Sequence, residues 1–180
     1  MPGKMVLILG GARSGKSTYA QNLAAQTGGR VLYVATAEAG DAEMQERIAA
    51  HRAERPPDWQ TLEAPRQVGQ VLLPLAAQVD VVLLDCVTLL ASNVLISFPE
   101  SASLAEIQHT MDAEIDALLE ACQRSQALWV MVSNEVGLGL VPPYALGRTY
   151  RDVLGRVNQR LAQVADEVLF LVAGLPMRVK

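Results

Sequence analysis

Five short, continuously apolar segments constrain the fold of this chain more than any other feature of its sequence. They are rich in valine and leucine, do not alternate apolar with polar residues, and cover residues 5–9, 31–36, 81–86, 127–134 and 167–174. Strands of this kind have helices on both faces, as in a mostly parallel sheet. The stretches between them have helical patterns, and we expect helices over residues 16–26, 47–55, 67–77, 86–97, 104–124 and 146–165. The alternation predicts a three-layer α/β fold with right-handed connections.

The length and composition are those of one globular domain covering residues 1–180. Apolar residues make up 51% of the chain and charged residues 19%, which is unlike a disordered segment. The net charge of −4 at pH 7 argues against nucleic-acid binding through bulk electrostatics. No apolar run approaches the roughly 20 residues that span a bilayer, and the first is too short for a signal peptide. We therefore expect a cytoplasmic protein without a membrane span, in which Cys86 and Cys122 are reduced thiols.

The segment GGARSGKS directly follows the first apolar run and fits the pattern G-x-x-x-x-G-K-S. Glycines in such a loop let backbone N–H groups surround a phosphate, and the N-terminus of the following helix adds a favourable field. Lys16 would reach the β- and γ-phosphates, and the Ser17 hydroxyl would ligate Mg²⁺. A chance glycine-rich turn is the alternative interpretation. The predicted phosphate-binding residues are Gly10, Gly11, Ala12, Arg13, Ser14, Gly15, Lys16 and Ser17.

Asp85, in the apolar segment VVLLDC, is a candidate for the second part of a magnesium–nucleotide site. A carboxylate at the end of a buried strand can hold Mg²⁺ directly or through water. The alternative is that Asp85 caps the helix that follows. Together with the glycine-rich loop, this pattern predicts a P-loop NTPase domain of the RecA-like type, with Ser17 and Asp85 as metal ligands.

The segment RIAAHRAERPPDW contains Arg47, His51 and Arg55 at four-residue steps, which a helix would place on about one face. Pro56 and Pro57 should end that helix. Two neighbouring cations disfavour a further positive charge, so the imidazole would stay neutral and keep a lone pair. Such a ring can attack a phosphate that the arginines bind. The spacing alone leaves two interpretations open, a nucleophile or an exposed, solvated helix face.

Several longer segments together point to one family, in its order and over nearly the whole chain. They are GGARSGKS, YVATAEAGDAEMQERIAAHRAERPPDWQTLE, LLDCVTLLASN, VSNEVGLGLVP and GRVNQRLAQVADEV. In these segments the chain resembles the bifunctional adenosylcobinamide kinase / adenosylcobinamide-phosphate guanylyltransferase family of cobalamin biosynthesis. The resemblance implies two reactions. Adenosylcobinamide is first phosphorylated with ATP or GTP, and GMP then passes from GTP through a histidine to the new phosphate. It also implies a homo-oligomer, namely a trimer.

The resemblance also assigns roles to particular residues. His51 is the only histidine in the matching segment, so it corresponds to the guanylylated histidine and forms the catalytic set with Lys16 and Asp85. Further nucleotide contacts of the family correspond to Ala35, Thr36, Ala37, Arg52, Ala53, Glu54, Arg55 and Glu63. A carboxylate such as Glu63 can accept both N1–H and the 2-amino group of guanine, a donor pair that adenine lacks; an ordinary surface acid is the alternative.

Other polar and aromatic residues permit more than one interpretation. Trp59 is favoured for core packing over stacking on a base, and His109 should face solvent. Asn134 and Glu135 follow a strand, so they should emerge at the carboxyl edge of the sheet, where ligands of open α/β sheets bind. One helix has a basic side that could serve phosphates or salt bridges, formed by Arg148, Arg151, Arg156 and Arg160. Two other functions remain open, a small-molecule kinase without a covalent nucleotide and a non-catalytic GTP-binding switch.

Overall fold

The computed structural model describes residues 3–38, 40, 42–53 and 55–180. Its strands are β1 (Met5–Gly10), β2 (Val31–Ala35), β3 (Gln60–Glu63), β4 (Val81–Asp85), β5 (Leu128–Val132), β6 (Glu167–Val172) and β7 (Leu175–Arg178). Its helices are α1 (Lys16–Ala25), α2 (Ala42–Ala53), α3 (Val68–Leu72), α4 (Val87–Ile96), α5 (Leu104–Gln123) and α6 (Ala145–Val164), with a 3₁₀ turn at Ala76–Gln78. None of the helices in this described part combines the length and apolar character that a bilayer crossing requires.

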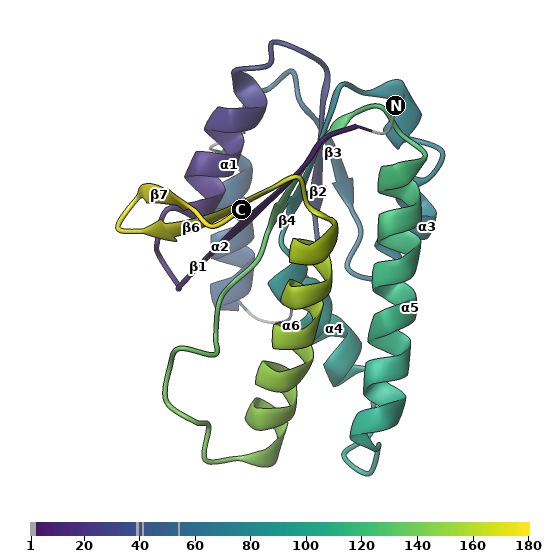
Figure 1. Ribbon diagram of the computed structural model, residues 1–180, viewed down its shortest axis with the longest axis vertical. Helices are drawn as coiled ribbons and strands as arrows, with labels where there is room; N and C mark the ends of the chain where they lie inside the picture. Colours follow the sequence, from purple (N-terminus) through teal and green to yellow (C-terminus); the bar gives the residue numbers. More distant parts are fainter. Residues whose placement is uncertain (1–2, 39, 41, 54) are drawn as a thin grey trace.

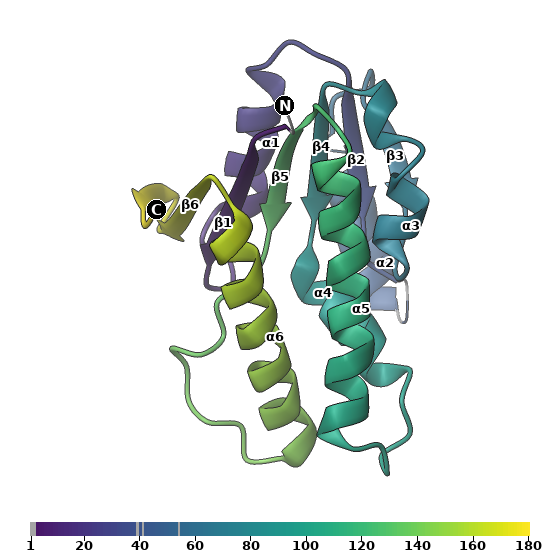
Figure 2. The same ribbon diagram turned by 45° about the vertical axis from the view of Figure 1, so that its right-hand side comes forward.

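The strands form one sheet in the order β3-β2-β4-β5-β1-β6-β7. Every neighbouring pair is parallel except β6 and β7, which are antiparallel. Helices α3, α4, α5 and α6 cover one face of this sheet, and α1 lies on the other (Figures 1 and 2). The predicted α/β fold with a mostly parallel sheet between helices is confirmed.

Alternate residues of the central strands enter two separate cores. On β1, Met5 and Leu7 pack with residues of α3 to α6, whereas Val6 and Ile8 pack with residues of α1. These four side chains are almost fully buried. Because both faces of the sheet exclude water, the strands appear in the sequence as continuous apolar runs rather than as alternating patterns.

The two edge strands, β3 and β7, are absent from the sequence prediction. Their sequences, QTLE and LPMR, are mostly exposed and contain no apolar run, and β7 has a proline that only an edge position tolerates. The predicted helix over residues 67–77 is also shorter. It ends at Leu72, because Pro74 cannot continue a helical hydrogen-bond pattern.

A tight turn between β6 and β7 packs against the glycine-rich loop. β6 ends before residue 174 because Ala173 and Gly174 have positive φ angles of 51° and 82°, which suit a two-residue hairpin turn. The N–H of Gly174 donates to the carbonyl oxygen of Ser14 at 2.9 Å. Gly15 has a φ of 89°, and a Cβ there would lie 3.1 Å from the Cα of Gly174. The conformation of the loop therefore depends on the hairpin behind it.

Gly10→Ala should lower the stability of the fold, because the new methyl group would lie 2.7 Å from the backbone oxygen of Leu171. Overpacking of this kind costs about 1–3 kcal/mol. Thermal unfolding followed by circular dichroism should register it as a fall of several degrees in Tm. Gly11→Ala is the matched control, since an added Cβ there meets no heavy atom within 4 Å. Equal melting temperatures for the two variants would contradict close packing of the end of β1 against Leu171 of β6.

Candidate active site

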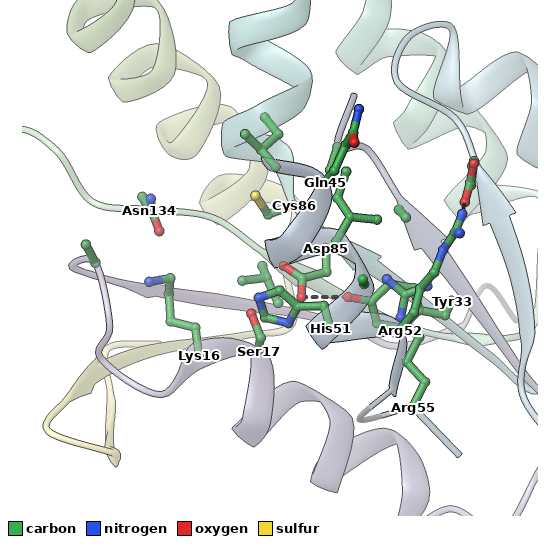
Figure 3. Close-up of a pocket in the computed structure, with 18 of the residues that line it drawn as sticks. Lys16, Ser17, Tyr33, Gln45, His51, Arg52, Arg55, Asp85, Cys86 and Asn134 are labelled. Carbon is green, nitrogen blue, oxygen red and sulfur yellow. Dashed lines mark hydrogen bonds and ion pairs between the residues drawn. The ribbon is translucent and has the colours of Figure 1, made fainter. Parts of the chain in front are cut away.

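A cavity of about 1010 Å³ opens at the carboxyl ends of β1, β2, β4 and β5. The glycine-rich loop, the strand ends, α2 and the segment after β5 line it (Figure 3). The predicted site residues that line it are Ala12, Arg13, Lys16, Ser17, Ala35, Ala37, His51, Arg52, Arg55, Glu63 and Asp85. One cavity thus brings together residues that the sequence suggested from three separate segments, at the sheet edge where ligands of open α/β folds bind.

Of the remaining predicted residues, those that the structure describes do not line this cavity. Gly10 ends β1, Gly11, Ser14 and Gly15 belong to the loop that follows, and Ala53 is exposed at the end of α2. Glu54 lies outside the residues that the structure describes. The nucleotide contacts of Ala53 and Glu54 stay predictions.

Thr36 is fully buried and joins the end of β2 to the start of α4. Its hydroxyl donates to the carbonyl oxygen of Cys86 at 2.7 Å and accepts from the Cys86 N–H at 2.9 Å. The side-chain amide of Asn93 donates to the carbonyl oxygen of Thr36 at 2.7 Å. Thr36 does not line the cavity. It holds the backbone of Cys86, next to the cavity residue Asp85, through its hydroxyl group.

Lys16 lines the cavity although it is only 7% exposed. Its ammonium group donates to the carbonyl oxygen of Gly11 at 2.5 Å and to the Ser14 hydroxyl at 3.4 Å. Burial lowers the pKa of Lys16 from its ordinary value, while the neighbouring Cys86 and Asp85 act in the opposite direction. Gly15 occupies the cap position of α1 and has no side chain to accept from the first turn. That turn can therefore donate its N–H groups to an anion.

Asp85 is the last residue of β4, and the Tyr33 hydroxyl donates a hydrogen bond to its Oδ2 at 2.8 Å (Figure 3). Cys86, not Asp85, occupies the cap position of α4, and no side-chain capping bond is formed there. The alternative that Asp85 caps α4 is therefore wrong. The carboxylate points instead to a partner on the neighbouring strand.

Ser17 and Asp85 have the right chemistry for magnesium. Hydroxyl and carboxylate oxygens are ligands that Mg²⁺ accepts, and both residues line the same cavity. Within the described ranges, no group of three or more histidine, cysteine and carboxylate side chains is clustered as a metal site. Mg²⁺ bound with a nucleotide needs only one or two protein oxygens, because phosphates and water complete its shell. The residues present fit such an ion.

His51 lies in the last turn of α2, is exposed, and lines the same cavity as Lys16 and Ser17 (Figure 3). The three residues come from two helices, since Lys16 and Ser17 begin α1. The side chain of Arg47, one of the two arginines expected on the face of His51, lies outside the described part of the chain. The imidazole of His51 and the residues of the glycine-rich loop thus line the same cavity.

Arg55 lies beyond the end of α2, which closes at Ala53, so the expected continuation of the helical face to Arg55 is wrong. Pro56 disfavours a helical conformation for the residue before it. The guanidinium group instead lies 3.8 Å from the centre of the Tyr33 ring. Its Nε and Nη1 are buried and have no hydrogen-bond partner among the described residues. These donors suit an oxygen-rich ligand in the cavity.

Arg52 and Glu63, two predicted nucleotide contacts, form an ion pair between α2 and β3. Their side chains are 53% and 54% exposed. Ion pairs in such exposed positions contribute roughly 1 kcal/mol or less. A ligand can therefore separate the two groups at small cost, and Glu63 is placed at the cavity rather than on a remote surface.

Tyr33 is the lining residue that sequence reasoning missed most completely. It lies within the apolar run VLYVA and is 2% exposed, so the pattern indicated core packing. The available signal was its position two residues before the end of a buried strand that leads to the ligand edge of the sheet. Cys86 and Leu89 also line the cavity, and the burial of Cys86 raises the pKa of its thiol to about 11.

Asn134 and Glu135 emerge at the carboxyl edge of the sheet, as predicted. Asn134 lines the cavity. Its backbone N–H donates a hydrogen bond to the Thr88 hydroxyl at 2.7 Å, which fixes the position of the backbone there. The Glu135 N–H donates to the carbonyl oxygen of Gly10 at 3.0 Å, and its carboxylate accepts from the N–H of Gly137. These contacts favour a loop-anchoring role for Glu135.

The other polar and aromatic residues have structural placements. Trp59 is half-buried against the core beneath α1, which confirms the expectation of core packing. His109 is exposed on α5, as expected. On the basic side of α6, Arg148 donates to the carbonyl oxygens of Pro142 and Pro143, and Arg160 pairs with Asp112 and Asp116 on α5. Salt bridges and loop contacts account for these two arginines.

The fold and the cavity define a P-loop nucleotide-binding protein of the RecA-like type. A solved structure, that of the RadB recombinase, superimposes with a TM-score of 0.50 at 18% identity and covers 94% of this chain and 74% of that chain. At this identity the likeness shows the fold alone.

The family comparisons are more specific. The family model described as cobinamide kinase / cobinamide phosphate guanyltransferase matches residues 6–179. The bifunctional adenosylcobalamin biosynthesis protein CobU of Salmonella typhimurium is 42% identical over 98% of this chain and 99% of its own length. The bifunctional adenosylcobalamin biosynthesis protein CobP of Pseudomonas aeruginosa is 46% identical over 97% and 96%. This chain therefore belongs to the cobinamide kinase / cobinamide phosphate guanyltransferase family and is an enzyme.

Thr36→Val should destabilise the fold, because it leaves the Cys86 N–H without its acceptor and removes one of the two hydrogen bonds to the Cys86 carbonyl oxygen. We expect the free energy of unfolding to fall by about 1–3 kcal/mol, measured by urea titration. Thr18→Val, at an exposed position of α1, is the control and should stay within about 0.5 kcal/mol of the parent protein. Similar values for the two variants would contradict the structural role of Thr36.

Proposed function

We propose that this enzyme catalyses two successive reactions in the cavity at the carboxyl edge of the sheet. It phosphorylates adenosylcobinamide with ATP or GTP, and it then transfers GMP from GTP, through a covalent adduct on His51, to give adenosylcobinamide-GDP. The observation that carries the proposal is the placement of His51 in one cavity with Lys16 and Ser17. A kinase alone needs only the phosphate-binding loop, whereas the second reaction needs a nucleophile beside it.

The phosphate groups of the nucleotide would bind where donors converge. The N–H groups of the first turn of α1 and the ammonium of Lys16 offer a cationic cradle for the β- and γ-phosphates. Arg55 adds two buried N–H groups that the described residues leave unpaired. In the kinase reaction, the hydroxyl of the acceptor attacks the γ-phosphorus in line with the departing nucleoside diphosphate.

The second reaction would proceed by two displacements. A ring nitrogen of His51 attacks the α-phosphorus of GTP, a P–N bond forms, and the bond from the α-phosphorus to the bridging oxygen breaks to release pyrophosphate. A phosphate oxygen of the acceptor then attacks the same phosphorus and breaks the P–N bond. One difficult displacement is thereby divided into two easier ones. Lys16 offsets the charge that develops on the leaving pyrophosphate.

Ser17 and Asp85 would hold Mg²⁺, which neutralises phosphate charge and orients the phosphate chain when it is bound. Both side chains line the cavity next to Lys16, so the ion would lie beside the phosphates that the loop binds. The hydrogen bond from Tyr33 occupies only one oxygen of Asp85.

Glu63 would select guanine at the opposite end of the nucleotide. Its carboxylate would exchange the ion pair with Arg52 for the N1–H and 2-amino groups of the base, which releases Arg52 for phosphate or ribose oxygens. Adenine presents no such pair of donors, so this contact would restrict the GMP-transfer step to GTP.

We also propose that residues 1–180 act as one catalytic domain, that the enzyme assembles as a homotrimer, and that it works in the cytoplasm. The support is the resemblance to the family and the single sheet that underlies the cavity. Sedimentation equilibrium of the purified protein measures the assembly, and a mass other than that of three chains would contradict the trimer.

Incubation with GTP labelled at the α-phosphate should label the wild-type protein with an acid-labile, base-stable adduct. His51→Ala should abolish the label, because no other imidazole lines the cavity among the described residues. His109→Ala is the matched control, since it removes the only other histidine, which is exposed on α5, and should leave labelling unchanged. Full labelling of the His51 variant would contradict the covalent assignment.

The same variants separate the two reactions. Kinase activity, followed as a phosphorylated corrinoid by chromatography, should largely survive His51→Ala and be lost in Lys16→Ala together with GMP transfer. A kinase product without any GMP-containing corrinoid in the wild-type enzyme would indicate a plain small-molecule kinase. GTP binding without any new corrinoid would indicate a nucleotide switch.

Glu63→Gln should weaken selection of guanine, because an amide cannot accept two hydrogen bonds with a full negative charge. Two such contacts predict a fall of about 10–100-fold in kcat/KM for GTP in the GMP-transfer step. Inosine triphosphate lacks the 2-amino group, so its kcat/KM should fall less than that of GTP. The preference for GTP over inosine triphosphate should therefore shrink. Arg52→Ala is the control, since it breaks the same ion pair and keeps the carboxylate. Arg52→Ala should preserve the preference for GTP. An equal loss of preference in both variants would contradict recognition of guanine by Glu63.

A further inference from the structure

Tyr33 places a hydroxyl group at a core position of the sheet. Its side chain is 2% exposed and belongs to the core beneath α1. Tyr33 is paired with Leu83 on β4, so the side chain of Asp85, two residues further on, leaves the same face of the sheet. The hydroxyl then lies 2.8 Å from Oδ2 of Asp85. The strand register itself fixes this contact.

The Tyr33 hydroxyl donates this hydrogen bond, because a carboxylate offers oxygen atoms that act as acceptors. A hydrogen bond from a buried donor restricts rotation of the carboxylate. It also occupies Oδ2 and leaves Oδ1 for a ligand in the cavity that Asp85 lines.

The position of the ring is set independently of the hydroxyl. The guanidinium group of Arg55 lies 3.8 Å from the ring centre, and the ring packs in the core. Phenylalanine at this position would keep the ring for stacking and packing and would remove the hydroxyl, and with it the hydrogen bond to Asp85. Tyr33→Phe therefore separates a role of the hydroxyl from a role in filling space.

We infer that Tyr33 is a positioning residue for the metal–nucleotide complex. By holding Oδ2 of Asp85, it presents Oδ1 toward the ion that accompanies the phosphates. The inference rests on the proposed function in that Asp85 serves as a magnesium ligand. Tyr33 acts only through Asp85, as partners of metal-binding carboxylates commonly do.

Binding of Mn²⁺, a paramagnetic substitute for Mg²⁺, tests this role without turnover. Electron paramagnetic resonance would follow titration of the full-length protein in complex with a non-hydrolysable GTP analogue. Tyr33→Phe should weaken Mn²⁺ binding about tenfold, the lower end of the range for such partners. The affinity for the analogue in EDTA and the Tm should change little. Tyr19→Phe, at another tyrosine packed against the same core, should leave all three quantities unchanged.

A second background tests whether the effect passes through Asp85. In Asp85→Asn, which lacks the charged ligand, adding Tyr33→Phe should cause no further loss of Mn²⁺ affinity. Unchanged Mn²⁺ binding in Tyr33→Phe alone, or an equal loss in both backgrounds, would overturn the inference. If Tyr33→Phe weakens Mn²⁺ binding as expected but His51 is not labelled by GTP, the positioning role of Tyr33 is supported and the covalent GMP step is contradicted. A wild-type complex that binds no Mn²⁺ would overturn the inference, whatever the labelling shows.

Discussion

The parallel order of β2, β4, β5 and β1 is the constraint on which the site depends. The carboxyl ends of parallel strands lie at one edge of the sheet, so the segments that follow these strands meet there although they are far apart in the sequence. The loop after β1, the carboxylate that ends β4 and the residues after β2 and β5 all reach one cavity for this reason. The loop also needs support from behind, which the turn between β6 and β7 gives through Gly174 and Ser14.

The parts that the sequence predicts well are those in which a local pattern has a single physical cause. Burial on both faces produces the continuous apolar runs, and the positive φ angle of 89° at Gly15 favours a glycine in the loop. The edge strands β3 and β7 escape prediction because an exposed edge imposes no comparable pattern. Tyr33 escapes it because its role arises from pairing with β4, a tertiary relation that no local spacing reports. The four-residue spacing predicts a helix face that includes Arg55, but α2 ends at Ala53, before Pro56.

Charge is distributed so that an acidic chain can still bind a triphosphate. The net charge is −4, yet the cavity is lined by the cations Arg13, Lys16, Arg52 and Arg55 and by the carboxylates Asp85 and Glu63. Each carboxylate has an assigned neighbour, Tyr33 for Asp85 and Arg52 for Glu63. A short-range arrangement of this kind determines ligand binding more than net charge does.

The two proposed reactions make different demands on one set of residues. In the kinase reaction the γ-phosphorus is attacked and the bound β-phosphate belongs to the leaving group. In GMP transfer the α-phosphorus is attacked, and both the β- and γ-phosphates leave together. A single glycine-rich loop would satisfy both demands, because Lys16 and the first turn of α1 would bind the leaving phosphates in either case. The attacking group alone must differ, and in the proposed mechanism the exposed His51 on α2, a helix separate from the loop, would supply the second nucleophile.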